Sequence, residues 1–257
     1  MNKIPLDIET IPGQAAAVLD ALRADAEAEK AECRAPGNYK DPEKIAANIA
    51  EQHAAIDAAV MDKWRKTSFD GAYGQIAVVS FAIDGGEPLK VWNEDWQHPQ
   101  AEHFLLHSLR EVMHDTIKPQ TELAAQIIGH NVSAFDLRFL VQRSMILGVK
   151  PHPVLARAAA CKPWETDRVY DTMVQWAGVG SRISLDKLCK ALGIPGKGDL
   201  DGSKVWDYVQ AGRIAEVADY CADDVRKVWA VYQRMTFARV EVLEDVPVMV
   251  GKYQATA

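Results

Sequence analysis

The N-terminal segment of the chain carries two acidic residues in an apolar setting. In IPLDIE, residues 4–9, Asp7 and Glu9 are two positions apart, and in a strand this spacing points both side chains to the same face. Neighbouring carboxylates repel and raise each other's pKa unless a cation lies between them. Carboxylate oxygens suit Mg²⁺ or Mn²⁺. The pair therefore fits a metal site, although a D-x-E pair alone is better explained as a solvated strand end before the turn at Pro12-Gly13.

A second acidic residue follows a distinctive turn in GHNVSAFD, residues 129–136. The segment joins an apolar strand to a helix, so His130 and Asn131 stand at the carboxyl end of the strand, where α/β sheets usually bind ligands. We expect both to contact substrate. Ser133 as a helix cap with Asp136 three residues later is the alternative explanation. The run G-H-N-x-x-x-F-D is more particular than a cap requires.

A third motif lies on a late helix. Tyr220 and Asp224 are four residues apart and therefore share one helix face, beside a predicted buried stripe. The alternative is a half-buried tyrosine with a surface aspartate. Asp219 and Asp223 lie nearby, and spacing alone does not decide which acid is functional. The buried stripe comprises Ile214, Val217, Cys221, Val225 and Val228.

Taken together and in this order, the three motifs resemble the DEDD 3′→5′ exonucleases, which have a ribonuclease H-like fold. The motifs are DIET at 7–10, GHNVSAFD at 129–136 and YCADD at 220–224, and the tyrosine points to the DEDDy subgroup. The chain is similar to the predicted exonucleases related to the proofreading domain of family B DNA polymerases. The stretch LGIPGKGDLDG at 192–202 strengthens this, since those relatives have a similar linker before the last motif.

The resemblance implies roles for five residues. Asp7, Glu9, Asp136 and Asp224 match the acids that hold two divalent metal ions, Mg²⁺ or Mn²⁺, and Tyr220 matches the catalytic tyrosine. Two-metal hydrolysis would release 5′-mononucleotides from a 3′ end. A phenol with a pKa near 10 is a poor base at neutral pH, so we expect the tyrosine to orient water.

Other candidates for substrate binding are basic and aromatic side chains, which can contact phosphates and stack on bases. Lys197 is in the G-K-G loop, where glycines let the backbone approach a ligand. Trp164 is in CKPW at 161–164, and the other four candidates are in DKWRK at 62–66. Tryptophans are more often core residues, and the lysines can simply solvate a helix, so this alternative stays open. The candidates are Lys63, Trp64, Arg65, Lys66, Trp164 and Lys197.

The predicted elements alternate between strands and helices, which is typical of a three-layer α/β arrangement. Asp41 and Pro42 begin a helix whose apolar face includes Ile45, Ile49, Ile56, Val60 and Trp64. Residues 75–83 and 89–92 form a predicted hairpin around Gly85-Gly86. A helix at 99–117, with Phe104 on its apolar side, a strand at 125–129, a helix at 134–147, a strand at 168–171 and later helices follow.

We therefore expect one domain, residues 1–257. Its predicted fold is ribonuclease H-like, with a mixed five-stranded sheet and a helical insertion of about residues 14–70. The insertion is longer than the corresponding loop of polymerase proofreading domains. The segment VEVLEDVPVMV at 240–250 has no assigned place.

Composition limits the function without choosing it. Of the 257 residues, 48% are hydrophobic and 25% charged, as in a globular protein, and no apolar run is long enough to cross a bilayer. We expect a cytoplasmic protein (in the host cell if phage-encoded) with no membrane partner. The net charge of −7 argues against nucleic-acid binding by a broad basic surface, but not against an enzyme that grips a strand end. Four scattered cysteines without C-x-x-C spacing favour neither zinc nor disulfides.

The expected substrate is single-stranded DNA with a free 3′ end; protein partners are not predicted. A 3′→5′ exoribonuclease is the first alternative, because the same catalytic set serves both nucleic acids and no residue is recognisably suited to the 2′-hydroxyl. A catalytically inactive nucleic-acid-binding module is the other, and it is disfavoured because all five motif residues are present.

Overall fold

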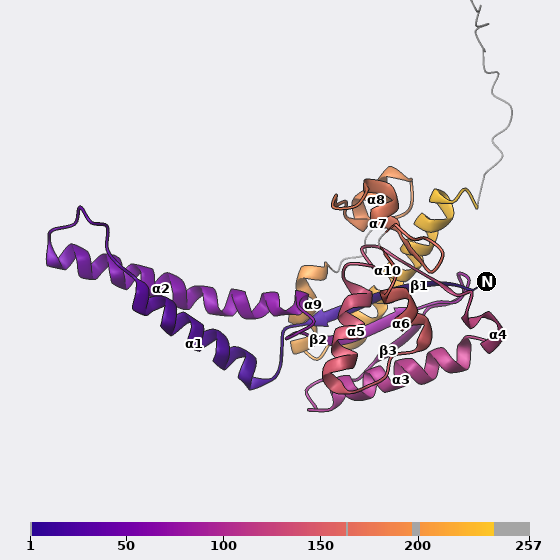
Figure 1. The fold of residues 1–257 in the computed structure, drawn as a ribbon, viewed down its shortest axis with the longest axis horizontal. Coiled ribbons are helices and arrows are strands. Elements are labelled where there is room, and N and C mark those ends of the chain that lie inside the picture. Colours follow the sequence, from indigo (N-terminus) through magenta and orange to yellow (C-terminus); the bar gives the residue numbers. More distant parts are fainter. Residues whose placement is uncertain (1, 163, 197–200, 239–257) are drawn as a thin grey trace, which may run out of the picture.

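The computed structural model describes residues 2–162, 164–196 and 201–238, and its centre is a five-stranded sheet of order β3-β2-β1-β4-β5 (Figure 1). β1 is antiparallel to β2 and parallel to β4. β3 extends the antiparallel side and β5 the parallel side, so the predicted mixed sheet is confirmed. The strands are β1 (Lys3–Ile11), β2 (Gln75–Phe81), β3 (Leu89–Trp92), β4 (Gln126–Gly129) and β5 (Val169–Asp171).

Helices cover both faces of the sheet and make three layers. One face packs against α3, α5 and α6, and the other against α9 and α10, with α8 outside α10. The helices are α1 (Ala16–Glu32), α2 (Pro42–Lys66), α3 (Ala101–Thr116), α4 (Pro119–Glu122), α5 (Asp136–Leu147), α6 (Pro153–Ala159), α7 (Thr172–Ala177), α8 (Leu185–Ala191), α9 (Val205–Gln210) and α10 (Ile214–Met235), and the 3₁₀ turns are η1 (Thr67–Phe69) and η2 (Gly202–Lys204).

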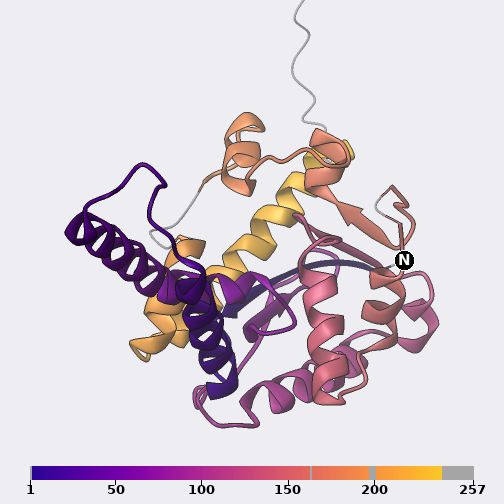
Figure 2. The same cartoon turned by 60° about the vertical axis from the view of Figure 1, so that its left-hand side comes forward.

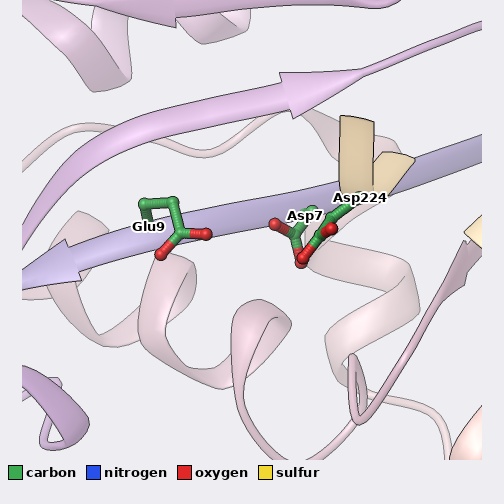
Figure 3. Close-up of side chains that lie close together, drawn as sticks. All are labelled: Asp7, Glu9 and Asp224. Atoms are coloured by element: carbon green, nitrogen blue, oxygen red, sulfur yellow. The ribbon is translucent and has the colours of Figure 1, made fainter. Parts of the chain in front are cut away.

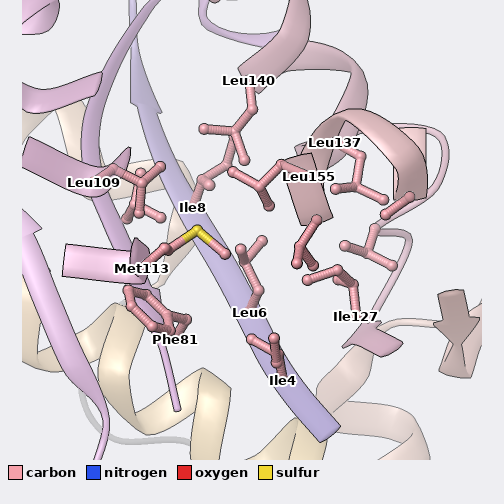
Figure 4. Packing of buried hydrophobic residues seen from close by; sticks show 14 of the residues in the cluster. Ile4, Leu6, Ile8, Phe81, Leu109, Met113, Ile127, Leu137, Leu140 and Leu155 are labelled. Atoms are coloured by element: carbon pink, nitrogen blue, oxygen red, sulfur yellow. The ribbon is translucent and has the colours of Figure 1, made fainter. Parts of the chain in front are cut away.

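The alternation of side chains along the central strand β1 determines where the acids lie. Leu6 and Ile8 are buried in the main core, under α3, α5 and α6 (Figure 4). Because successive strand residues face opposite ways, Asp7 and Glu9 are on the other face, the one that α10 covers. Ile11 has the same parity and packs in the α9 and α10 cluster. One strand therefore supplies both a core face and an acidic face.

The predicted insertion is a helical hairpin of α1 and α2 that projects from the body of the molecule (Figures 1 and 2). Asp41 caps α2 by accepting a hydrogen bond from the backbone N–H of Glu43, as predicted. Ile56 and Val60 are buried against α1, whereas Ile45 and Ile49 are only half-buried. Two helices packed only on each other bury a narrow seam, so the prediction of one continuous buried face is wrong toward the tip.

Most predicted elements are present with ends shifted by a few residues. One alternative is excluded and one local prediction is wrong. Ser133, weighed as a helix cap, does not cap α5, because that helix begins at Asp136 with Phe135 as its N-cap residue. Phe104 is 49% exposed on α3, because Leu105 and Leu109 take the core side. The segment at 240–250 lies outside the described residues, and no described helix is long and apolar enough to span a membrane.

Candidate metal centre

Three carboxylates from distant parts of the sequence meet beside the central strand. Asp7 and Glu9 from β1 and Asp224 from α10 each offer an oxygen atom, and these atoms lie within 4.8 Å of one another. Figure 3 shows the Asp7 and Asp224 carboxylates side by side, with that of Glu9 turned toward them along β1. The β1–β2 register shifts between Glu9 and Thr10, an irregularity of the kind that re-aims a strand side chain.

The burial of α10 selects Asp224 among the neighbouring acids. The predicted apolar stripe is fully buried against the sheet, and within it the thiol of Cys221 lies 3.4 Å from Asp7 Oδ2. This orientation turns Asp224 inward. Asp219 and Asp223 are on other faces of the helix, where they pair with Lys90 and Arg226. Spacing left three candidate acids, and packing distinguishes them.

Asp136 is the fourth acid, at the first position of α5. It is 3% exposed, and its Oδ1 accepts a hydrogen bond of 3.1 Å from the backbone N–H of Ile8, between the two acids of β1. We call Asp7, Glu9, Asp136 and Asp224 the acidic site. The structure brings all four predicted acids to one place.

The turn that carries Asp136 is held by an aspartate that sequence analysis missed. Asp171 is 1% exposed at the end of β5 and accepts hydrogen bonds from the backbone N–H groups of Asn131 and Ser133, each at 3.0 Å. It also caps α7 through the N–H of Met173. The capping role of Asp171 could have been predicted from the sequence, because an acid directly before a helix often caps it. The contact of Asp171 with the turn could not, because 40 residues separate Asp171 from Asn131.

Burial and mutual repulsion make the acidic site costly when it is fully ionised. Burial is the largest cause that raises the pKa of Asp7 well above its ordinary value, followed by repulsion from the other three acids. The pKa of Glu9 is raised by burial first and then by Asp224 and Asp136. Burial raises the pKa of Asp136 to about 7, against the lowering effect of its backbone hydrogen bonds. A bound cation would relieve this cost.

Lys227 supplies a positive charge that sequence analysis also missed. Its Nζ lies 2.8 Å from Asp224 Oδ1, with 12% and 16% of the two side chains exposed. The ammonium also lies 5.8 Å from the centre of the Tyr220 ring. Lys227 is three residues after Asp224 and seven after Tyr220, so helical periodicity could have placed it on the same face. A single ammonium neutralises only part of four carboxylates.

Tyr220 is one helical turn before Asp224 and shares a small cavity with it and Lys227. Burial is the main cause that raises the pKa of its hydroxyl, and the negative charges of Asp224, Glu9 and Asp7 add to it. The phenol therefore stays protonated at neutral pH. It is suited to donating or accepting a hydrogen bond and not to removing a proton.

His130 and Asn131, the two predicted substrate-binding residues of the GHN turn, both make contacts within the protein. The ring nitrogens of His130 lie 2.9 Å from Thr172 Oγ1 and 2.8 Å from the carbonyl oxygen of Ile183. Burial lowers the pKa of His130, which favours the neutral ring. Asn131 has a φ of 65° and supports the turn through its backbone. A direct contact of either side chain with substrate stays a prediction, and for His130 it would require one of these bonds to break.

The basic cluster at the end of α2 points in several directions. Lys63 pairs with Glu29 of α1 at 3.0 Å. The indole N–H of Trp64 donates to the carbonyl oxygen of Gly13, and its ring packs edge-on against Trp206, so it has structural partners, and its contact with substrate stays a prediction. Arg65 and Lys66 line a cavity that reaches Glu9.

The remaining two predicted contacts are Trp164 and Lys197. Trp164 is 65% exposed between α6 and the edge strand β5, with the Lys162 ammonium 5.8 Å from its ring centre. Lys197 lies outside the described residues. Substrate contact by either residue stays a prediction.

The mixed sheet between two helical layers, with acids on its central strand, defines the ribonuclease H-like class. A family model described as "predicted 3′-5′ exonuclease related to the exonuclease domain of PolB" matches residues 71–246, well over half of the chain. The chain belongs to this family of predicted 3′–5′ exonucleases. The matched range includes Asp136, Tyr220 and Asp224, whereas Asp7, Glu9 and the helical hairpin precede it.

Among solved structures, the chain is similar to the family B DNA polymerase from the hyperthermophilic archaeon Pyrobaculum calidifontis. The TM-score is 0.51 with 16% sequence identity, over 92% of this chain and 24% of the polymerase chain. The chain thus corresponds to about a quarter of that polymerase, and at this identity the similarity concerns the fold. The curated proteins contain no match.

Proposed function

We propose that the protein is a metal-dependent 3′→5′ exonuclease that removes 5′-mononucleotides from the 3′ end of single-stranded DNA. The observation that carries this proposal is the convergence of Asp7, Glu9 and Asp224 within 4.8 Å, with Asp136 buried beside them. Membership of the exonuclease family supports the reaction. That the substrate is DNA, and that it is single-stranded, is proposed in addition to the reaction itself.

The residues of the acidic site fit divalent metal ions. All four side chains are carboxylates, the hard oxygen ligands that Mg²⁺ and Mn²⁺ prefer. Repulsion within the acidic site adds to burial in raising the pKa values of Asp7 and Glu9, which indicates negative charge that a divalent ion would neutralise. Asp7, Glu9 and Asp224 are the closest set, and Asp136 would complete the ligands of a two-ion site. When bound, two such ions would supply Lewis acidity for the attacking water and for charge on the phosphate oxygens.

The chain's own residues would orient the reactants. Tyr220, protonated because its pKa is raised, would hydrogen-bond the attacking water through its hydroxyl and hold it in line with the scissile bond. Lys227 lies close enough to Tyr220 and Asp224 to place positive charge near the phosphate. Asp171 would keep Asp136 in position by fixing the backbone of the preceding turn.

Digestion of oligonucleotides tests the proposal directly. Matched DNA single strands, DNA duplexes and RNA strands carrying a 5′ label are incubated with the protein and Mg²⁺ or Mn²⁺, with a chelator as the control. We expect a ladder that shortens from the 3′ end, with 5′-mononucleotides as products, fastest on single-stranded DNA. Preferential digestion of RNA would mean that the substrate is RNA and that the protein is a 3′→5′ exoribonuclease. Absence of hydrolysis with either metal would overturn the proposal.

A further inference from the structure

A groove leads away from Glu9 between two parts of the chain that are far apart in sequence. It has a volume of about 390 Å³ and passes between the end of α2 with η1 on one side and η2 with the start of α9 on the other. Its walls include Arg65, Lys66 and Phe69 from the root of the helical hairpin. These three residues precede the range matched by the family model. The groove is therefore partly built by a segment that the family model does not cover.

Phe69 is the most unusual residue of this groove. Its side chain is 71% exposed at the end of η1, although a phenylalanine ring loses free energy when left in water. The ring contacts Phe135, next to Asp136, with 6.5 Å between ring centres. A second cavity of about 390 Å³ lies beyond it, lined by Phe69, Phe135 and Arg138. Phe69 thus stands between two cavities that continue from the acidic site.

Basic side chains accompany this path in a chain whose net charge is −7. Arg65 lies at the first cavity, where it pairs with Asp207 at 3.0 Å, both half-exposed. Lys66 lines the same cavity and is exposed, and Arg138 is exposed at the second. The acids that line the first cavity with these cations are Glu9 and Asp62, the latter on α2 like Arg65 and Lys66. Aromatic rings with alternating cations are what single-stranded nucleic acid requires, because every base has a stacking face and every nucleotide a phosphate.

We propose that this path, the upstream groove, binds the nucleotides that precede the 3′-terminal dinucleotide, with a base stacked on Phe69 and phosphates near Lys66 and Arg138. This inference rests on the proposed function, because it takes the 3′ end to lie at the acidic site. The helical hairpin would then act through its root, and Lys63 and Trp64, which are engaged in the hairpin and its junction, would not contact the strand. The enzyme would prefer strands several nucleotides long over a dinucleotide.

The test compares Phe69→Ala with a matched variant, Phe104→Ala, which removes another exposed phenylalanine, on α3. The kcat/KM is measured on a DNA dinucleotide and on an octanucleotide, and octanucleotide binding is measured by fluorescence anisotropy. Phe69→Ala should lower affinity and kcat/KM for the octanucleotide about tenfold, the factor expected for one lost base–aromatic stack, and leave the dinucleotide unchanged. Phe104→Ala should change neither. Lys66→Ala should reduce the slope of log affinity against log salt by about 0.7.

The outcomes separate this inference from the proposed function. If the wild-type protein hydrolyses no strand, the proposed function fails, and the anisotropy measurements still decide whether Phe69 binds the octanucleotide. If hydrolysis occurs but Phe69→Ala matches Phe104→Ala on the octanucleotide, the upstream groove does not bind the strand. Equal losses on the dinucleotide and octanucleotide would also overturn the inference, because they would indicate damage to the acidic site.

Discussion

Two groups of charged side chains on opposite faces of the sheet are compensated in different ways. On the α3 side of the sheet, Glu102 is 6% exposed and accepts two hydrogen bonds from the guanidinium of Arg143, at 2.9 and 2.7 Å, and one from the backbone N–H of Ile76. On the α10 side, the four acids of the acidic site have one ammonium beside them among the described residues, that of Lys227. The first set is balanced by its own partner, whereas the described part of the chain leaves the second with excess negative charge.

This difference distinguishes the Glu102–Arg143 pair, whose charges have a structural role, from the acidic site, whose charges suit a functional one. A buried ion pair with its hydrogen bonds satisfied ties α3 and α5 together and needs no further partner. A cluster of buried like charges opposes folding, and a protein retains it at a site where something else supplies the balance. The pKa of Asp7 expresses that cost, because burial and then repulsion from the other three acids raise it well above its ordinary value. Substitutions at the two places should therefore have opposite consequences.

The largest effect should come from neutralising the acidic site. Asp136→Asn and Asp224→Asn should each lower nuclease activity on the order of 10³-fold or more, because each removes a ligand of the metal site. Stability should be kept or increased, since repulsion falls and the amide oxygen introduced at position 136 can still accept from the Ile8 N–H. Nuclease assays and thermal melts measure both. Asp223→Asn, on an exposed face of the same helix, is the control. Turnover at the wild-type rate by either variant would show that the substituted acid is not a functional member of the acidic site.

The balanced pair should respond in the other way. Glu102→Gln and Arg143→Met each leave a buried partner without its counter-charge, which costs about 3–5 kcal/mol of stability. Activity per folded molecule should stay unchanged, because neither residue is part of the acidic site. Urea denaturation followed by circular dichroism measures the stability. A loss below about 1 kcal/mol in both variants would contradict the comparison.

A smaller effect on activity is expected at Tyr220. Tyr220→Phe removes one hydroxyl and should lower kcat on the order of 10²-fold with little change in strand binding, since one positioning hydrogen bond is lost. Single-turnover assays at saturating strand measure this. Tyr170→Phe, on the edge strand β5, is the matched control. An equal decrease in both variants would mean that the Tyr220 hydroxyl does not act on the water.

The smallest effect should be a dependence of apo stability on pH. Because the pKa of Asp136 is raised to about 7, the folded protein binds more protons than the unfolded chain between about pH 4 and 7, so this acid makes stability fall as pH rises. With a chelator, the melting temperature should be a few degrees lower at pH 8 than at pH 5. Mn²⁺ should restore it at pH 8, and Asp136→Asn should flatten the dependence. If Asp136→Asn leaves the pH dependence of the melting temperature unchanged, that dependence arises from other groups.

Several parts of the fold were predictable because their signals are local. The strand alternation of residues 4–9, the apolar run of 75–81 and the cap at Asp41 each depend on neighbours in sequence, and the structure has all three. The buried stripe of α10 was likewise set by helical periodicity. The partial burial of Ile45 and the exposure of Phe104 were not predictable, because each depends on what packs against the helix.

From the sequence, the resemblance of the three motifs to the DEDD exonucleases predicted the acids of the acidic site and the class of reaction, whereas spacing alone placed carboxylates on known faces of a strand and a helix without choosing among them. Only the tertiary structure decided which distant residues surround them. Asp171 beneath the GHN turn and Phe69 beside Phe135 each contact residues far away in the sequence. The physical reason is that charge compensation and exposure depend on distances in space. A motif fixes distances only over a few residues of chain.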